Sequence, residues 1–397
     1  ARQLLLFAYV LGECLLLSLH EQQGESFMSG ETDVLPLRGV DHVRFFVGNA
    51  RQSAYFYRNA FGFKVTAYAG LETREKHEAG YVLQQGDIRF VLASPLGPEH
   101  PESHRLITHG DGVQDIALEV DDVTQAYEEA TRRGAKGLVK PTKLEDDDGV
   151  YELATIATYG DTTHTFVNHD NYNGVHMPGY KPIDPERYSE GTFRDTGLVS
   201  IDHIVGNVEE GRMDEWVKFY QDVMGFHQLI SFDDKDISTE YTALMSKVVS
   251  SGHGRIKFPI NEPAEGKRRS QIEEYIQYYR GAGVQNIAMT TDNIIETVRA
   301  LRDNDVSFLR VPHTYYEVLH KRVGDIEESI DDLAELGILV DRDDEGYMLQ
   351  IFTKPVEDRP TLFFEIIERH GSRSFGKGNF KALFEAIELE QAKRGTL

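Results

Sequence analysis

The sequence predicts an α+β protein in which one structural module is written twice. Two ordered pairs of matching segments carry this prediction. The segment Val40–Val43, with the sequence Val-Asp-His-Val, corresponds to Ile201–Ile204, with the sequence Ile-Asp-His-Ile. Further along each half, Gly110–Ala117 corresponds to Gly281–Ala288. Several matches in the same order indicate an internal duplication rather than chance similarity.

Each half is expected to contain two strand–helix–strand units. The first match in each half is followed by an aromatic-rich segment of helical period, which ends at Gly62 or Gly225. Glycine is favoured where a helix ends, because it adopts the left-handed conformation without strain. The second match leads into an amphipathic segment, Val123–Arg133 or Ile294–Asp303. Units of this kind predict mixed sheets with helices packed against them.

The pattern divides the chain into four parts. Residues 1–34 are interpreted as an extension or leader outside the fold, because their apolar run Leu4–Leu17 is short and no clear cleavage pattern follows it. Residues 35–171 form the first module and residues 197–397 the second. The segment 172–196 is rich in proline, glycine and charge, and is predicted to link them.

The composition argues against several classes of partner. The chain has 42 basic and 66 acidic residues, a net charge of −24. Such a surface repels phosphate backbones and anionic lipid, so neither nucleic acid nor a membrane is an expected partner. The single cysteine, Cys14, excludes an internal disulfide and a multi-cysteine zinc site. The chain is expected to be cytoplasmic, since outside the leader it has no apolar segment of membrane-spanning length.

Two residues of the second half are candidate metal ligands. By strand alternation His203 shares a face with β-branched apolar neighbours, where a histidine packed in the core is the alternative interpretation. Glu365 interrupts the apolar strand Leu362–Ile367, where an unpaired carboxylate is costly unless the strand is an exposed edge. The corresponding strand Thr163–Asn168 has no carboxylate, so the first module is predicted to be structural and metal-free. With one more imidazole, His203 and Glu365 would form the ligand set of iron(II) oxygenases, which leaves open positions for a 2-oxo acid and dioxygen.

Six segments in the second half make the chain resemble the 4-hydroxyphenylpyruvate dioxygenase family, over about residues 36–396. They occur in the order Lys257–Pro263, Ser270–Ile272, Gly281–Ala288, Leu349–Pro355, Phe363–Arg369 and Phe375–Phe380. The resemblance implies two tandem vicinal-oxygen-chelate modules of βαβββ repeats. It also implies that the C-terminal module is catalytic, an open barrel around the metal with a C-terminal lid helix.

The resemblance implies an activity and a set of site residues. The implied reaction converts 4-hydroxyphenylpyruvate and dioxygen to homogentisate and carbon dioxide in tyrosine catabolism, with iron(II) held by His203 and Glu365. The residues implied in catalysis are Gln271, Gln350 and Phe352. Those implied in substrate binding are Ser246, Asn261, Gln271, Gln350, Phe352, Phe363, Phe375, Asn379 and Phe380. Residues alone leave core packing open for the aromatic positions and a solvated helix face for Gln271.

One position departs from the family pattern. Asn286 stands where the family has its remaining ligand histidine, and an amide is a weaker donor with a shorter reach. An engineered inactive variant, a lineage that uses amide or water, and a paralogue without catalysis all stay open.

Two functions compete with the implied one. One is 4-hydroxymandelate synthase, which shares the fold and substrate, and the other is a metal-poor binding protein, which Asn286 supports. The resemblance implies that a large ring at Phe352 favours attack on the aromatic ring over attack on the side chain, so homogentisate is the expected product. Exposed sheet edges predict a homodimer or homotetramer.

Overall fold

The computed structural model describes residues 34–183, 194–233, 239 and 241–397. The described residues from Val34 to Leu397 belong to one compact unit. Of the predicted leader 1–34, all but Val34 lies outside the described residues. Among the residues that the structure describes, no helix has the length and apolar character needed to cross a membrane.

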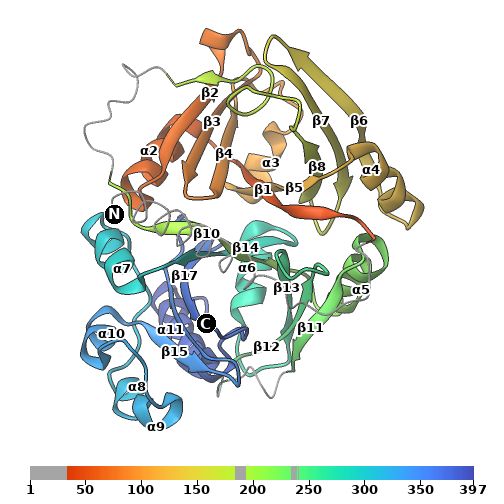
Figure 1. Ribbon diagram of the computed structural model, residues 1–397. Coiled ribbons are helices and arrows are strands. Elements are labelled where there is room, and N and C mark those ends of the chain that lie inside the picture. The colour runs from red at the N-terminus through yellow and green to blue at the C-terminus, as the bar shows by residue number, and fades with distance from the viewer. Residues whose placement is uncertain (1–33, 184–193, 234–238, 240) are drawn as a thin grey trace, which may run out of the picture. The chain divides into compact units, whose positions relative to one another are not determined.

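The first module contains two βαβββ repeats, as predicted (Figure 1). Its first repeat consists of β1 (Leu37–Phe46), α2 (Ala50–Phe61), β2 (Lys64–Ala69), the short η1 (Leu71–Thr73), β3 (Glu78–Gln85) and β4 (Ile88–Pro95). After the connecting helix α3 (Ser103–His109), the second repeat consists of β5 (Gly112–Val120), α4 (Val123–Arg132), β6 (Gly137–Asp146), β7 (Gly149–Ala157) and β8 (Thr163–Asn168).

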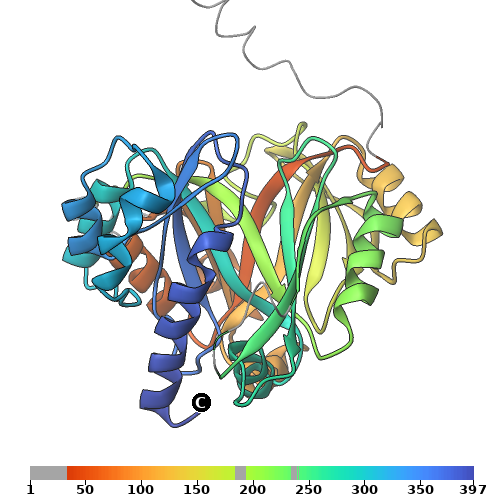
Figure 2. The same cartoon turned by 90° about the horizontal axis from the view of Figure 1, so that it is seen from below.

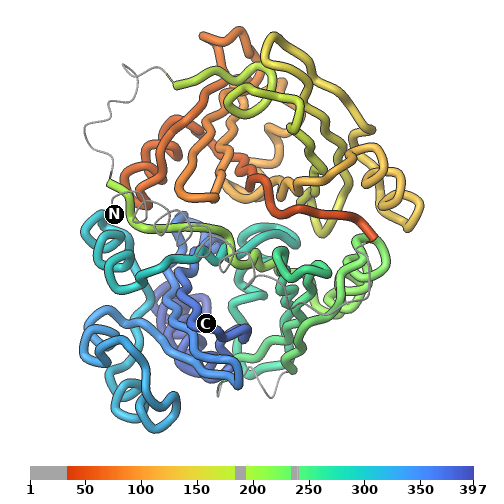
Figure 3. Tube along the Cα trace, in the orientation of Figure 1, coloured from red at the N-terminus to blue at the C-terminus, as the bar shows by residue number. Residues whose placement is uncertain are grey.

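The second module repeats this order with additions, and the tube in Figure 3 follows the chain through it from green to blue. Its first repeat consists of β10 (Leu198–Asn207), α5 (Met213–Met224), β11 (His227–Phe232), β12 (Ala243–Ser250) and β13 (Lys257–Ala264). Helix α6 (Gln271–Tyr279) leads to the second repeat, which consists of β14 (Gly283–Thr291), α7 (Ile294–Asp303), β15 (Leu339–Arg342), β16 (Tyr347–Phe352) and β17 (Phe363–His370). Helices α8 (Thr314–Glu317), α9 (Leu319–Val323) and α10 (Ile330–Leu336) lie between α7 and β15, and η3 (Lys377–Asn379) and α11 (Phe380–Arg394) end the chain.

Each module forms one curved mixed sheet. The first sheet also includes the short strand β9 (Lys181–Pro182), and its strand order is β6-β7-β8-β5-β1-β4-β3-β2-β9. The strand order of the second sheet is β11-β12-β13-β10-β14-β17-β16-β15. The first and last strands of a repeat pair in parallel, as β10 does with β13 and β14 with β17. The two repeats of a module meet through an antiparallel pair, β1 with β5 and β10 with β14. These pairings confirm the α+β prediction and bring β10, β14 and β17 side by side.

The predicted helix ends are confirmed by the backbone. Gly62 and Gly225 have φ angles of 75° and 72°, in the left-handed region that ends a helix. Among the helices that begin at a side chain accepting a hydrogen bond from a backbone N–H of the first turn are α2 with Asn49, α4 with Asp122 and α7 with Asn293. These caps explain why α4 and α7 begin three residues after the last residue of β5 and β14.

One helix of each module packs against the outer face of the other module's sheet. The ring of Phe61 in α2 lies 5.0 Å from that of Phe364 in β17. In the corresponding place, the Tyr220 hydroxyl of α5 lies 2.8 Å from Nε2 of His164 in β8. A single group of contacting apolar side chains extends through both modules. The main apolar core therefore lies on the outer faces of the sheets, and other segments of the chain cover their concave faces.

The concave face of the first sheet is filled by the segment that the sequence assigns to the start of the linker. Tyr180 packs against Ala67, Val82 and neighbouring apolar side chains, and Lys181–Pro182 pair with β2 as strand β9. A Cβ atom added to Gly80 would lie 2.2 Å from the Tyr180 hydroxyl oxygen, so glycine makes room for this ring. Residues 172–183 thus belong structurally to the first module, and residues 184–193 of the predicted linker lie outside the described residues.

The second sheet is covered instead by α11, which Figure 2 shows in front of its strands. The helix is rich in alanine, leucine, glutamate and lysine, which are strong helix formers. Arg394 near its end makes an ion pair of 2.8 Å with the buried Glu274 of α6, and Lys354 lies 3.1 Å from Glu390. These contacts hold the predicted lid helix over the concave face.

Candidate metal centre and substrate cavity

His203 and Glu365 lie in one row across three adjacent strands. Ala288 of β14 pairs with His203 of β10 on one side and with Glu365 of β17 on the other. The two side chains point inward, with Nε2 of His203 3.3 Å from Oε2 of Glu365. Both are buried, with exposed fractions of 6% and 5%. Because β17 lies between β14 and β16, the alternative of an exposed edge strand for Glu365 is wrong.

Asn286 lies beside this row. It pairs with Val205 and Phe363, two positions before Ala288 on β14, and therefore faces the same side of the sheet. Its side chain is buried, and its Nδ2 atom has no hydrogen-bond partner within the described protein. Buried amides are normally paired, so this unused group is unusual for a purely structural asparagine. The structure thus brings the three predicted ligand positions together.

The donor set fits a divalent metal ion held by two good ligands and one weak ligand. An imidazole and a carboxylate are donors that iron(II), manganese and zinc accept. The amide of Asn286 is not tied to another group through Nδ2, so it can turn its oxygen toward an ion between His203 and Glu365.

The orientation of His203 is set by the preceding residue. Nδ1 of His203 lies 2.7 Å from Oδ2 of Asp202, so Nδ1–H donates to this carboxylate and Nε2 is left to face Glu365. Burial opposes a charge on His203, yet the carboxylates of Glu365 and Asp202 outweigh it and raise the pKa of the imidazole above its usual value. Burial also opposes ionisation of Asp202, but hydrogen bonds from His203 and Arg369 hold its pKa well below the usual range.

These side chains line a cavity on the concave face of the second sheet, which together with its opening to solvent contains about 670 Å³ of empty space. Eleven of the twelve predicted site residues contribute to its wall: His203, Ser246, Asn261, Gln271, Asn286, Gln350, Phe352, Phe363, Glu365, Phe375 and Phe380. Gln271 is buried at the start of α6, so the alternative of a solvated helix face is wrong. A cavity with an apolar wall and a few converging polar groups is typical of a small-molecule site.

Aromatic rings enclose the metal side of the cavity. The Phe375 ring lies 5.2 Å from the His203 ring, and Phe352 and Phe363 meet edge to face at 6.3 Å. On the lid, Phe380 packs edge to face on Phe232 at 4.9 Å. These rings are buried or half-buried around open space rather than closed on one another, which favours a ligand-binding wall over plain core packing.

Asn379 is the predicted residue that the structure does not bring into the cavity wall. It is buried at the junction of η3 and α11, where its Oδ1 accepts hydrogen bonds from Tyr315 (2.7 Å) and Arg322 (3.2 Å). Arg322 also donates to the carbonyl oxygen of Gly378. In this structure Asn379 fixes the place where the lid helix begins.

Sequence reasoning missed Gln285, which lines the cavity next to Asn286. Neighbouring strand residues normally face opposite sides, but the pairing of β10 with β14 shifts register between Val205 and Gly206, where Gln285 is the extra residue. Its Oε1 accepts a hydrogen bond of 2.6 Å from the fully buried Asn207, whose Oδ1 accepts a weak one of 3.4 Å from Asn261. No pattern in the sequence announces such a bulge.

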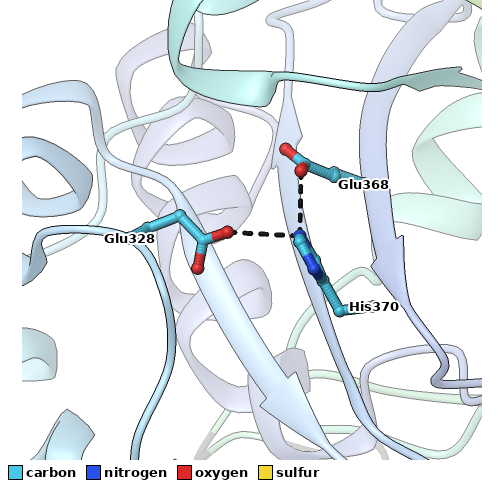
Figure 4. Close-up of side chains that lie close together, drawn as sticks. All are labelled: Glu328, Glu368 and His370. Atoms are coloured by element: carbon cyan, nitrogen blue, oxygen red, sulfur yellow. Dashed lines mark hydrogen bonds and ion pairs between the residues drawn. The ribbon is translucent and has the colours of Figure 1, made fainter.

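A second group of possible ligands lies away from the cavity wall (Figure 4). Nε2 of His370 lies 2.8 Å from Glu368 and 3.2 Å from Glu328. The other oxygen of Glu368 accepts the backbone N–H of Ile294 at the start of α7, and the His370 ring stacks on Tyr347 at 4.4 Å. Helix capping and stacking account for this cluster, so it is interpreted as a structural junction.

Comparisons with known proteins agree with this fold. The family model described as Glyoxalase/Bleomycin resistance protein/Dioxygenase superfamily matches residues 39–155 and 200–351. The chain is therefore a member of this superfamily, whose modules are the repeats described above. A solved structure of a triple mutant of 4-hydroxymandelate synthase from Streptomyces coelicolor superposes with a TM-score of 0.80 at 30% identity. It covers 90% of this chain and 100% of that one.

Closer relatives define the family more narrowly. The chain is 47% identical to the 4-hydroxyphenylpyruvate dioxygenase of Dictyostelium discoideum over 91% of its length and 100% of that protein. It is 46% identical to the enzyme of the same name from Yarrowia lipolytica, over 91% of this chain and 94% of the relative. The chain belongs to the 4-hydroxyphenylpyruvate dioxygenase family.

Proposed function

We propose that the chain is a dioxygenase that converts 4-hydroxyphenylpyruvate and dioxygen to homogentisate and carbon dioxide in tyrosine catabolism. The observation that carries the proposal is the convergence of His203, Asn286 and Glu365 in one buried cavity of a chain of this family. The substrates are a small 2-oxo acid and dioxygen, which suit a cavity with an apolar wall and a few converging polar groups.

The proposed cofactor is iron(II), held by His203 and Glu365 with Asn286 as a weak third ligand. When bound there, iron(II) supplies the positions that a 2-oxo acid chelates and the activation of dioxygen. Asp202 keeps His203 in the tautomer that presents Nε2. The weak amide predicts an iron affinity below that of a two-histidine site.

The remaining residues of the cavity are proposed to bind and orient the substrate. Gln271, Gln350, Asn261 and Ser246 offer amide and hydroxyl groups to its polar atoms, from α6, β16, β13 and β12 respectively. The phenylalanine rings hold the aromatic ring in place and exclude water from the reacting atoms. Closure by α11 completes this exclusion, since Phe380 at its first turn lines the cavity.

The direct test is oxygen uptake by the purified protein with 4-hydroxyphenylpyruvate, iron(II) and ascorbate. We expect one homogentisate and one carbon dioxide for each dioxygen consumed. A matched control is Glu365→Gln, which keeps the size of the side chain and removes its charge, and which should abolish uptake. Absence of homogentisate from the parent at saturating iron would contradict the proposal.

Two other functions are separated by the same assay. Production of 4-hydroxymandelate would identify the protein as a 4-hydroxymandelate synthase, an enzyme whose solved structure has the same fold. Binding of a substrate analogue with neither metal uptake nor turnover would identify a metal-poor binding protein. The weak amide of Asn286, where the family has a ligand histidine, is the observation that supports this second alternative.

The assembly and location of the protein are proposed on the sequence alone. We propose a homodimer or homotetramer, since sheets with open edges usually bury these edges against another subunit. The cytoplasm is the proposed location. The chain mass is 45.0 kDa, so light scattering should report at least twice this value. A single species of 45.0 kDa would contradict the proposed assembly.

A further inference from the structure

The side chain of Arg369, four residues after Glu365 on β17, connects two parts of the second module. Its Nε and Nη2 donate to the two carboxylate oxygens of Asp202 at 2.8 and 2.9 Å. Its Nη1 donates to the backbone carbonyl oxygens of Ser372 and Ser374 at 3.1 and 2.9 Å. The planar guanidinium of arginine has enough fixed donors to make all four contacts at once, whereas the single ammonium group of lysine does not.

Both ends of this connection lead to the metal centre. Asp202 accepts the Nδ1–H of His203 and so sets the direction of Nε2. The carbonyl oxygens of Ser372 and Ser374 belong to the segment that carries Phe375, whose ring covers the imidazole of His203 at 5.2 Å. The guanidinium also lies 5.9 Å from the Phe375 ring. One side chain thus contacts both the group that orients His203 and the segment that shields it.

The first module contains the same arrangement around its own Asp–His pair, which shows what Arg369 adds. Asp41 lies 2.6 Å from Nδ1 of His42, 2.9 Å from Nε2 of His169 and 3.2 Å from Arg89. The strand pairings make His169 the counterpart of Arg369, because Thr165 and Glu365 occupy equivalent positions and 169 − 165 = 369 − 365. An imidazole has two ring nitrogens, so His169 cannot make the four contacts of Arg369.

We propose that Arg369 is a positioning residue for the metal site. It acts through Asp202 to hold the His203 ring toward Glu365, and it fastens the Ser372–Phe375 segment over that ring. The inference rests on the proposed metal centre. It extends that proposal, because Arg369 does not line the cavity and has no place in the ligand set.

The test uses binding of Co²⁺ to the apo-protein, read from its visible absorption, in both the parent and the Asn286→His background. Arg369→Met should weaken Co²⁺ binding by about tenfold or more, as loss of a contact that orients a ligand typically does, and should change the spectrum of what binds. Asp202→Asn should have a similar effect. The loss in the double variant should be smaller than the product of the two single losses, because part of the effect of Arg369 on His203 is proposed to pass through Asp202.

Three controls keep the outcomes separate. The counterpart change His169→Gln in the first module should leave Co²⁺ affinity unchanged, since it disturbs the same kind of cluster where no metal is proposed. Thermal unfolding shows which variants are folded. If Arg369→Met does not fold, Arg369→Lys takes its place and should bind Co²⁺ with an affinity between that of its background and that of Asp202→Asn. Failure of both the parent and the Asn286→His protein to bind Co²⁺ would contradict the proposed metal centre itself.

The inference about Arg369 has its own decisive results. It is overturned if folded Arg369→Met binds Co²⁺ as its background does, or if Asp202→Asn has no effect. Independent losses that multiply in the double variant would also overturn it, because they would mean that Arg369 does not act through Asp202. An equal loss in His169→Gln would reduce the effect to general destabilisation.

Discussion

The two modules carry the same Asp–His pair on their first strands, but in the described part of the chain the surroundings of the two pairs differ. In both, the histidine Nδ1 contacts the preceding carboxylate, at 2.6 Å for His42 and 2.7 Å for His203. In the first module the ring of His42 meets that of the buried His176 at 5.0 Å. In the second module His203 faces Glu365 and a cavity. Both modules therefore orient a histidine in the same way, and they differ in the groups that this histidine meets.

The positions that correspond to Glu365 and Asn286 also differ between the two modules. The counterparts of Glu365 and Asn286 are Thr165 and Asp115, as the strand pairings show. Asp115 accepts a hydrogen bond of 2.9 Å from Thr165 and another from Thr163. Its carboxylate is satisfied by its neighbours, whereas Asn286 keeps an unpartnered atom. At this pair of positions, the polar side chain of the first module is satisfied by its neighbours, and that of the second module is not.

The segment after the last strand follows the same rule. Tyr180 lies 15 positions after Thr165, and Phe380 lies 15 positions after Glu365. Tyr180 enters the first sheet and packs over Gly80, whose counterpart in the second sheet is the cavity residue Ser246. The proline- and glycine-containing first segment forms no helix there, while the helix-forming second segment lies across the opening as α11. The segment after the last strand therefore fills the concave face of the first sheet as a plug, and it covers the concave face of the second sheet as a lid.

The largest expected effect comes from removing the plug. Tyr180→Ala should lower the free energy of unfolding by about 3–5 kcal/mol, because a large buried ring leaves a cavity behind. The control Tyr180→Phe keeps the ring and should cost about 1 kcal/mol. Urea unfolding of both variants, with Co²⁺ titration alongside, checks the comparison. A Tyr180→Ala protein that is as stable as the parent, or that has lost metal affinity, would contradict it.

The next effect separates the two histidines. His203→Asn should weaken Co²⁺ or iron(II) binding by at least about 100-fold, since losing a ligand costs more than losing a contact that orients one. His42→Asn makes the same substitution in the same local setting and should leave the metal affinity of the folded protein unchanged. Equilibrium titration of the two apo-proteins decides. Equal losses in both would mean that the first module takes part in metal binding.

The smallest effect concerns the product. Phe352→Leu enlarges the cavity beside Phe363 and should raise the share of 4-hydroxymandelate among the products, within the roughly tenfold range that one hydrophobic contact controls. Phe232→Leu, at the lid end of the cavity, is the matched control and should leave the product ratio as it is. Chromatography of the reaction products gives both ratios. An unchanged ratio in Phe352→Leu would remove Phe352 from the control of where oxygen is added.

Periodicity and repetition in the sequence were sufficient to predict the α+β class and the duplication, because duplicated motifs and helix-ending glycines report local structure. They also located the row of His203 and Glu365, since a carboxylate in an apolar strand needs a partner. They did not find Gln285, which enters the cavity through a register shift that only the pairing of β10 with β14 reveals. Nor did they show that residues 172–183 fill the first sheet, because the proline and glycine that indicate a linker also suit an irregular buried segment.

The central claim is that the metal centre lies at His203, Asn286 and Glu365, with the amide as its weak ligand. The most direct test is an iron(II) titration of the parent and of Asn286→His under the same anaerobic conditions. The account predicts that the histidine variant binds iron(II) at least about tenfold more tightly, with turnover rising alongside, because an imidazole replaces the amide at the same position. Equal affinities in the two proteins would show that residue 286 is not a metal ligand and would contradict the account.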